Sequence, residues 1–136
     1  MVRTGGDPAD FGGVDLVERI EGLVDLKAIR AAGLKVMVDA MFGAGAGYIP
    51  TLASGGATVA DEMNGHPNPA FPGMEQPEPI AHNLTRLRER LTAGEGSVGL
   101  ALDGDADRLG VVDEKGRFIT TLEVFSLLAF YLLEHK

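Results

Sequence analysis

Apolar residues recur along the chain with two spacings, one typical of helices and one typical of short buried strands. Between residues 15 and 32 they fall three or four positions apart, which predicts a helix that Gly22 divides into two pieces. Similar spacing predicts a helix near 80–91. We also expect a helix near 47–54, which Gly55 and Gly56 close, and a last helix at 122–134. Because ten of the thirteen residues in the last segment are apolar, we expect it to be covered on more than one side.

Short apolar runs between these helices predict strands, at 35–40, 57–60, 97–102 and 109–112. Helices that alternate with strands indicate an α/β sandwich with a largely parallel sheet. The link between the third and fourth runs is too short for a parallel crossover, so we expect the fourth strand to run antiparallel. Residues 118–119 could extend this pairing.

Three segments are predicted to lie outside regular structure. Residues 1–13 are rich in Gly, Asp and Pro and are interpreted as a linker or tail, which leaves 14–136 as one domain. Residues 61–79 contain five prolines and are predicted to form a long loop, and loops of that length are usually functional. The glycine-rich stretch 43–47 lacks the Lys-Ser/Thr pair of a P-loop, so it predicts a tight strand-to-helix turn.

Composition excludes several classes of function. The net charge of -8 and the pI of about 4.7 give no basic surface for nucleic acid or for an anionic membrane. With no cysteine, the chain has no disulfide, zinc-thiolate site or cysteine nucleophile. It contains no apolar stretch of the roughly 20 residues that a bilayer requires, and its start lacks the apolar core of a signal peptide. We therefore expect a soluble cytoplasmic protein.

Three carboxylates at a spacing of two directly follow the third predicted strand. Asp103, Asp105 and Asp107 are separated only by small residues, so a curled loop can bring them to one point. Oxygen-only ligation suits magnesium, manganese or calcium. Arg108 can offset the remaining negative charge and hold a phosphate. The alternative is a solvated acidic turn in which Arg108 pairs with a neighbour.

Two other sites share part of this pattern. A calcium EF-hand also begins D-x-D-x-D, and Glu114 stands twelfth, but Arg108 occupies the position that needs glycine and a strand precedes the loop. Phosphatases with an aspartyl nucleophile place D-x-D after a buried strand, which would make Asp103 the nucleophile. They have Thr two residues after the second Asp, where this chain has Asp107.

The segment Asp103-Gly104-Asp105-Ala106-Asp107-Arg108 resembles the metal loop of the α-D-phosphohexomutases, the phosphoglucomutase and phosphomannomutase group. The resemblance extends in the family's order over four further segments, 38–45, 71–73, 77–79 and 109–116. Together these motifs span most of the chain and match the second domain of the family. They imply a three-layer α/β/α sandwich with a four-stranded mixed sheet, its last strand antiparallel, within a four-domain enzyme.

The resemblance also implies a mechanism. Asp103, Asp105 and Asp107 would bind Mg²⁺, which holds a phosphoserine of the first domain, and Arg108 would stabilise the phosphoryl charge. The enzyme would move a phosphoryl group between the 1 and 6 positions of a hexose phosphate through a hexose bisphosphate. Its partners would be these sugars and the other three domains, with glucose, mannose or glucosamine as the sugar.

The chain departs from the family by what it lacks. The T-A-S-H-N-P nucleophile segment and the third-domain sugar loop are missing, and Ser54, Ser97 and Ser126 lie outside any such motif. We therefore expect the chain alone not to turn over substrate. The alternative is a stand-alone divalent-metal-binding or interaction module without catalysis. The three histidines show no ligand spacing, and neither they nor Asp39, a candidate helix cap, is assigned to the site.

Overall fold

The computed structural model describes residues 16–135. Its elements alternate much as the sequence predicts, and Gly22 does separate two short helices. In chain order they are α1 (Leu16–Glu21), α2 (Leu26–Ala31), β1 (Lys35–Asp39), α3 (Tyr48–Ala53), β2 (Val59–Met63), α4 (Thr85–Thr92), β3 (Val98–Leu102), β4 (Leu109–Asp113), β5 (Phe118–Ile119) and α5 (Thr121–His135).

The sheet has the strand order β2-β1-β3-β4-β5. Strand β1 pairs in parallel with β2 and β3, and β4 pairs antiparallel with β3. This confirms the expected mixed sheet and its antiparallel fourth strand. The expected count of four strands is wrong, because β5 adds a fifth through the pairs Val111↔Ile119 and Val112↔Phe118. The possible extension of the pairing at 118–119 is thereby confirmed, as a separate strand of two residues.

Helix α4 covers one face of the sheet and forms the core there. Its Leu87 and Leu91 are fully buried, and each such side chain contributes about 1.5–3 kcal/mol by leaving water. A Cβ on Gly99 of β3 would lie 2.6 Å from a methyl of Leu91, so glycine at this position lets the helix approach the strand. The buried cluster comprises Met37, Met41, Met63, Leu84, Leu87, Leu91, Ala101 and Val112.

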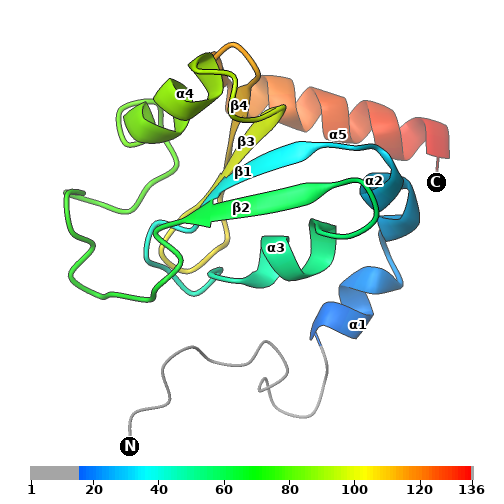
Figure 1. Cartoon of the computed structure of the whole chain (residues 1–136), viewed down its shortest axis with the longest axis horizontal. Coiled ribbons are helices and arrows are strands. Elements are labelled where there is room, and N and C mark those ends of the chain that lie inside the picture. Colours follow the sequence, from blue (N-terminus) through cyan, green and yellow to red (C-terminus); the bar gives the residue numbers. More distant parts are fainter. Residues whose placement is uncertain (1–15, 136) are drawn as a thin grey trace, which may run out of the picture.

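The other helices complete the sandwich, as Figure 1 shows with α4 on one side of the sheet and α3 on the other. Helix α2 is capped by Asp25, whose carboxylate accepts a hydrogen bond from the Ala28 N–H. The buried hydroxyl of Thr58 donates to the Ile29 carbonyl at 2.6 Å and accepts from the Leu34 N–H at 3.0 Å. These bonds fix the end of α2 against the start of β2.

Strand β2 extends further than predicted and takes in the first three residues of the expected loop. Its charged residues are held by partners: Asp61 accepts a 2.7 Å hydrogen bond from Arg90 of α4. Both carboxylate oxygens of Glu62 accept from the Gly47 N–H, at 3.0 and 3.1 Å, and this joins β2 to the start of α3. Burial raises the pKa of Glu62. The sequence did not predict the end of β2 correctly because these partners come from distant parts of the chain.

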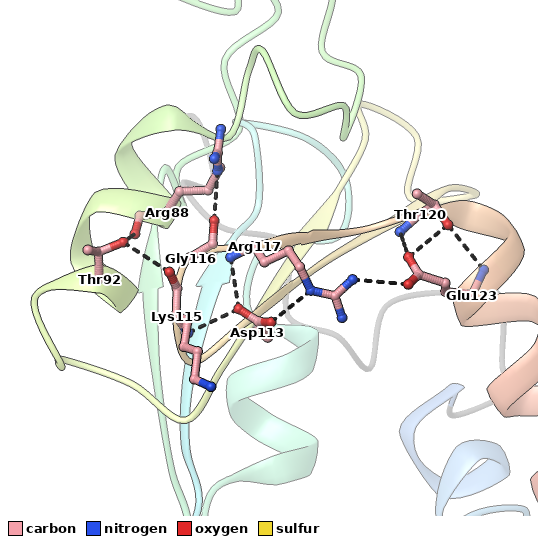
Figure 2. Close-up of polar contacts among 8 residues, drawn as sticks. All are labelled: Arg88, Thr92, Asp113, Lys115, Gly116, Arg117, Thr120 and Glu123. Carbon is pink, nitrogen blue, oxygen red and sulfur yellow. Dashed lines mark hydrogen bonds and ion pairs between the residues drawn. The ribbon is translucent and has the colours of Figure 1, made fainter.

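The turn between β4 and β5 is held on one side by α4 and on the other by the start of α5 (Figure 2). Arg88 of α4 donates from Nε to the Gly116 carbonyl at 2.8 Å. On the other side, Arg117 donates to Asp113 at 3.1 Å and to Glu123 at 3.0 Å. The hairpin therefore connects α4 to α5 through side-chain bonds as well as through the chain.

Helix α5 begins with a capping box. The Thr120 hydroxyl accepts from the Glu123 N–H at 3.3 Å, and the Glu123 carboxylate accepts from the Thr120 N–H at 2.8 Å. This backbone bond, followed by the Arg117 contact, lowers the pKa of Glu123 to about 2. No residue of α5 is buried, so the expectation that it is covered on more than one side is wrong for this chain. Within residues 16–135, no helix combines the length and apolar character needed to cross a membrane.

Candidate metal centre

The carboxylate loop joins β3 and β4, two adjacent antiparallel strands inside the sheet, at the end where β3 finishes. Asp103 directly follows β3, and β4 begins directly after Arg108. Leu102 and Leu109, the strand residues that flank the loop, are therefore paired across it. The Ala106 N–H donates to the Asp103 carbonyl at 3.2 Å, and Ala106 has a φ of 64°. This left-handed residue curls the loop instead of letting it run on as a strand.

The curl brings the three predicted ligands together. One carboxylate oxygen from each of Asp103, Asp105 and Asp107 lies within 4.8 Å of the others. Asp103 is buried, whereas Asp105 and Asp107 are exposed. Oxygens about 2.1 Å from one Mg²⁺ lie at most about 4.2 Å apart, so small rotations of the two exposed side chains would suffice. An all-oxygen set of this kind fits a hard divalent cation.

Repulsion among these carboxylates perturbs their ionisation. The pKa of Asp107 is raised by its hydrogen bond to Asp103 and by the negative charges of Asp105 and Asp103. Burial also acts to raise the pKa of Asp103, but hydrogen bonds from Arg108 outweigh it and the net shift is downward. A buried aspartate thus stays ionised beside a neighbour that resists ionisation. A bound dication would relieve this repulsion.

Arg108 holds the buried aspartate with two hydrogen bonds. Its Nε donates to Asp103 Oδ2 at 2.7 Å, and its backbone N–H donates to Asp103 Oδ1 at 3.1 Å. Its Nη1 donates to Glu78 at 2.9 Å, while the side chain remains 56% exposed. Asp103 and Glu78 therefore fix the guanidinium at the rim of the site. Glu78 was not predicted as a site residue, although it lies within segment 77–79, one of the segments that resemble the phosphohexomutases.

The glycine turn after β1 packs directly against the carboxylate loop. A Cβ on Gly43 would lie 2.7 Å from the carbonyl oxygens of both Asp103 and Gly104, which only glycine allows. The next N–H, that of Ala44, donates to the Gly104 carbonyl at 2.9 Å. The turn is tight, as the sequence predicts, and its role is to pack against the carboxylate loop.

Two residues of the long loop, Phe71 and Pro77, also pack against the carboxylate loop. A Cβ on Gly104 would lie 3.0 Å from Pro77 Cγ and 3.3 Å from Phe71 Cζ, so both residues contact the carboxylate loop closely. Phe71 has a φ of 41°, and Met41 and Asn64 are also left-handed, at 46° and 54°. Strained backbone of this kind is often found at functional sites.

Buried Asp39 holds two of the strained residues in place. Its Oδ1 accepts from the Met41 N–H at 2.9 Å and from the Asn64 side chain at 2.8 Å. Burial raises the pKa of Asp39, with these hydrogen bonds opposing the shift. The residue therefore stabilises the turn after β1 rather than capping α3.

The remaining candidates have structural roles or lie elsewhere. The hydroxyls of Ser54 and Ser97 each accept a backbone N–H, and that of Ser126 donates to the Leu122 carbonyl. Among the described residues, the aspartate trio is the one group of three acidic or histidine side chains arranged to hold a metal. A strand precedes the loop, so the structure also argues against an EF-hand.

A family model described as phosphoglucomutase/phosphomannomutase, alpha/beta/alpha domain II, matches residues 15–116, including the carboxylate loop. The chain belongs to the phosphoglucomutase/phosphomannomutase family. Within it, a protein from Thermococcus kodakarensis named "Phosphoglucomutase/phosphomannomutase" is 38% identical over 88% of this chain. A "Probable phosphoglucosamine mutase" from Methanopyrus kandleri is 35% identical over 86% of it.

A solved structure of the phosphoglucomutase/phosphomannomutase family agrees with the fold. The crystal structure of a Thermus thermophilus protein assigned to the phosphomannomutases matches 87% of this chain, with a TM-score of 0.78 and 33% identity. The chain spans 26% of the length of the two curated relatives and 28% of that crystallised chain. It therefore corresponds to about one quarter of such a mutase.

Proposed function

We propose that this chain is the magnesium-binding domain of a phosphosugar mutase. The observation that carries the proposal is the convergence of Asp103, Asp105 and Asp107 within 4.8 Å, in a chain that matches the family's second domain. The full reaction would move a phosphoryl group between the 1 and 6 positions of a hexose phosphate, through a phosphoserine enzyme and a hexose bisphosphate. The related proteins are named as mutases for glucose, mannose and glucosamine phosphates, which supports a sugar phosphate substrate.

The proposed roles follow from burial and charge. Asp103, fixed by Arg108, is the preformed ligand, while the exposed Asp105 and Asp107 complete the set. The ion would supply positive charge for the transferring phosphoryl group. Arg108 would stabilise charge on the same group, with its guanidinium oriented by Glu78. The nucleophilic serine and the sugar-binding residues would come from the other domains, so the chain alone would be inactive.

Metal binding by the chain alone is the first test. We expect Mg²⁺ to shift the amide signals of Gly104 and Ala106 in an NMR titration, with a dissociation constant near 1 mM or weaker, roughly -4 kcal/mol. Asp105→Asn should weaken binding about tenfold or more and leave the other signals in place, because Asp105 is exposed. Glu114→Gln removes an exposed carboxylate outside the cluster and should leave the affinity unchanged. Loop signals that do not move at 50 mM Mg²⁺ would contradict the proposed ligand set.

A domain exchange tests the enzymatic part. Residues 15–136 should replace the matching domain of the Thermococcus kodakarensis relative, with interconversion of glucose 1-phosphate and glucose 6-phosphate as the assay. We expect an active chimera, and loss of kcat by at least 100-fold when the chimera carries Asp105→Asn. A folded but inactive chimera, in which the loop still binds Mg²⁺, would favour the alternative of a metal-binding module without catalysis.

A further inference from the structure

Helix α5 is apolar around its whole circumference and yet lies outside the core. Residues 124–133 contain no charged side chain, and no residue of the helix is buried. At about 100° per residue, its large exposed side chains leave no gap wider than roughly 60° around the helix axis. These side chains are Leu122, Phe125, Leu127, Leu128, Phe130, Tyr131, Leu132 and Leu133. Helices that are apolar on all sides are normally buried in proteins.

The described part of the chain provides little to cover this helix. The capping box between Thr120 and Glu123 and the ion pair between Arg117 and Glu123 fix its first turn against the β4–β5 hairpin (Figure 2). Beyond that turn, Leu128 and Leu132 remain 55% and 52% exposed, and contacts with the other described elements are sparse. The buried cluster between α4 and the sheet contains no residue of α5.

The arrangement of these apolar side chains restricts what can cover α5. At about 150 Å² for each when fully exposed, the eight present roughly 800 Å², whereas the largest apolar patch on a typical monomer is about 300–600 Å². A single partner helix buries one face of α5 and leaves the other faces in water. A membrane surface does not fit either, because a helix that lies on it needs a polar face. Only a folded domain, with a sheet on one side and helices beside it, encloses a helix all round.

The match with domain II indicates which domain this is. The family model covers residues 15–116 and ends before α5 begins at Thr121. The chain spans 26% of the length of the two curated relatives, so such mutases contain further domains. We infer that α5 belongs to the core of an adjoining domain of the longer mutase, whose own sheet and helices enclose it. The inference rests on the proposed function only in taking the chain as part of such a mutase, and it requires neither Mg²⁺ binding nor catalysis.

This assignment makes the β4–β5 hairpin the joint between two domains. Strand β4 leads from the carboxylate loop to the hairpin. Arg117 of the hairpin then donates to Glu123 in the first turn of α5 at 3.0 Å, and the Thr120 N–H donates to the same carboxylate at 2.8 Å. These bonds set the direction in which α5, and with it the adjoining domain, leaves domain II.

Truncation tests whether α5 is part of the domain II fold. A chain that ends at Ser126 keeps the capping box and the Arg117 ion pair but loses the apolar residues from Leu127 onward. We expect its urea midpoint and the NMR signals of its sheet to match those of the 136-residue chain. Leu87→Ala, in the buried core, is the control and should lower the midpoint. A truncated chain that unfolds, or that loses as much stability as Leu87→Ala, would overturn the inference, because α5 would then stabilise domain II itself.

Hydrogen exchange in a chimera tests what encloses α5. Residues 15–136 replace the matching stretch of the Thermococcus kodakarensis relative, as in the domain exchange above. We expect the amides of residues 127–135 to exchange about 100-fold or more slowly in the chimera than in the 136-residue chain. Phe130→Glu should lower the thermal midpoint of the chimera but not that of the 136-residue chain. Val59→Glu adds the same charge to a side chain that is 59% exposed on edge strand β2, and it should change neither midpoint.

Three results would count against the inference. In the first, a folded chimera exchanges the amides of α5 as fast as the 136-residue chain does. In the second, only a chimera with the relative's own helix after residue 120 folds. In the third, α5 of the 136-residue chain already exchanges slowly, in a particle of twice the 14.3 kDa chain mass, which would assign the helix to a second copy. A chimera that protects α5 but neither binds Mg²⁺ nor turns over substrate would instead support the inference and refute the proposed function.

Discussion

Substitution of Gly43 by alanine should lower the stability of the fold and also displace the metal loop. The added Cβ would lie 2.7 Å from the carbonyl oxygens of Asp103 and Gly104 and 2.9 Å from the Gly104 Cα. All three neighbours are backbone atoms, so the loop must move by roughly 0.7 Å to reach ordinary contact near 3.4 Å. The φ of Gly43 is not positive, so this contact alone disfavours alanine. Overpacking of this kind costs about 1–3 kcal/mol.

Urea denaturation followed by circular dichroism measures that cost. With a slope of about 1–3 kcal/mol/M, the Gly43→Ala midpoint should fall by about 1 M, and the NMR-monitored affinity for Mg²⁺ should fall several-fold. Gly22→Ala is the matched control, since its nearest neighbour, the Arg19 carbonyl oxygen, lies at 3.5 Å. That variant should be unchanged or slightly more stable. If both variants unfold at the wild-type midpoint, the glycine turn does not support the loop.

Two further changes test electrostatics. The folded pKa of Glu123 is about 2 against 4.5 for an unperturbed glutamate, so its contribution to stability is present above about pH 4.5 and is lost as pH falls toward 2. Glu123→Gln should therefore lower the thermal midpoint at pH 7 but have little effect near pH 2. The control variant Glu134→Gln should not lower the midpoint at pH 7. Equal losses of the Glu123→Gln midpoint at both pH values would refute this reasoning. Arg108→Met removes the cation that pairs with Asp103, so it should lower the thermal midpoint without metal and tighten Mg²⁺ binding in the NMR titration. A folded Arg108→Met chain that binds Mg²⁺ more weakly would show a different balance. The positioning of Asp103 by the arginine would then outweigh its competition with Mg²⁺ for that carboxylate.

The metal loop was predictable because its chemistry is local. Asp103, Asp105 and Asp107 lie within five residues, and the strand before them has a clear apolar run. The antiparallel β4 also followed from local geometry, since the connection is short. In contrast, Glu78 reaches Arg108 from thirty residues away, and only the fold brings this pair together.

The predicted boundaries of helices and strands were wrong where side chains have partners far away in the sequence. Asp61 and Glu62 look unsuited to a strand, yet Arg90 and the Gly47 N–H hold them in β2. The helix predicted from residue 80 begins only at Thr85, because the Asn83 side chain donates to the carbonyls of Gln76 and Glu78 and fixes a turn there. Apolar content predicted α5 as a helix but did not show what would cover it.

The two edges of the sheet restrict how the molecule can associate. At one edge, β2 carries Asp61 and Glu62, and at the other, β5 is only two residues long. Acidic side chains and very short strands both deter a foreign strand from adding to an open edge. Fibre-like stacking through the sheet is therefore disfavoured, and close contacts with other molecules are directed to helical surfaces and loops.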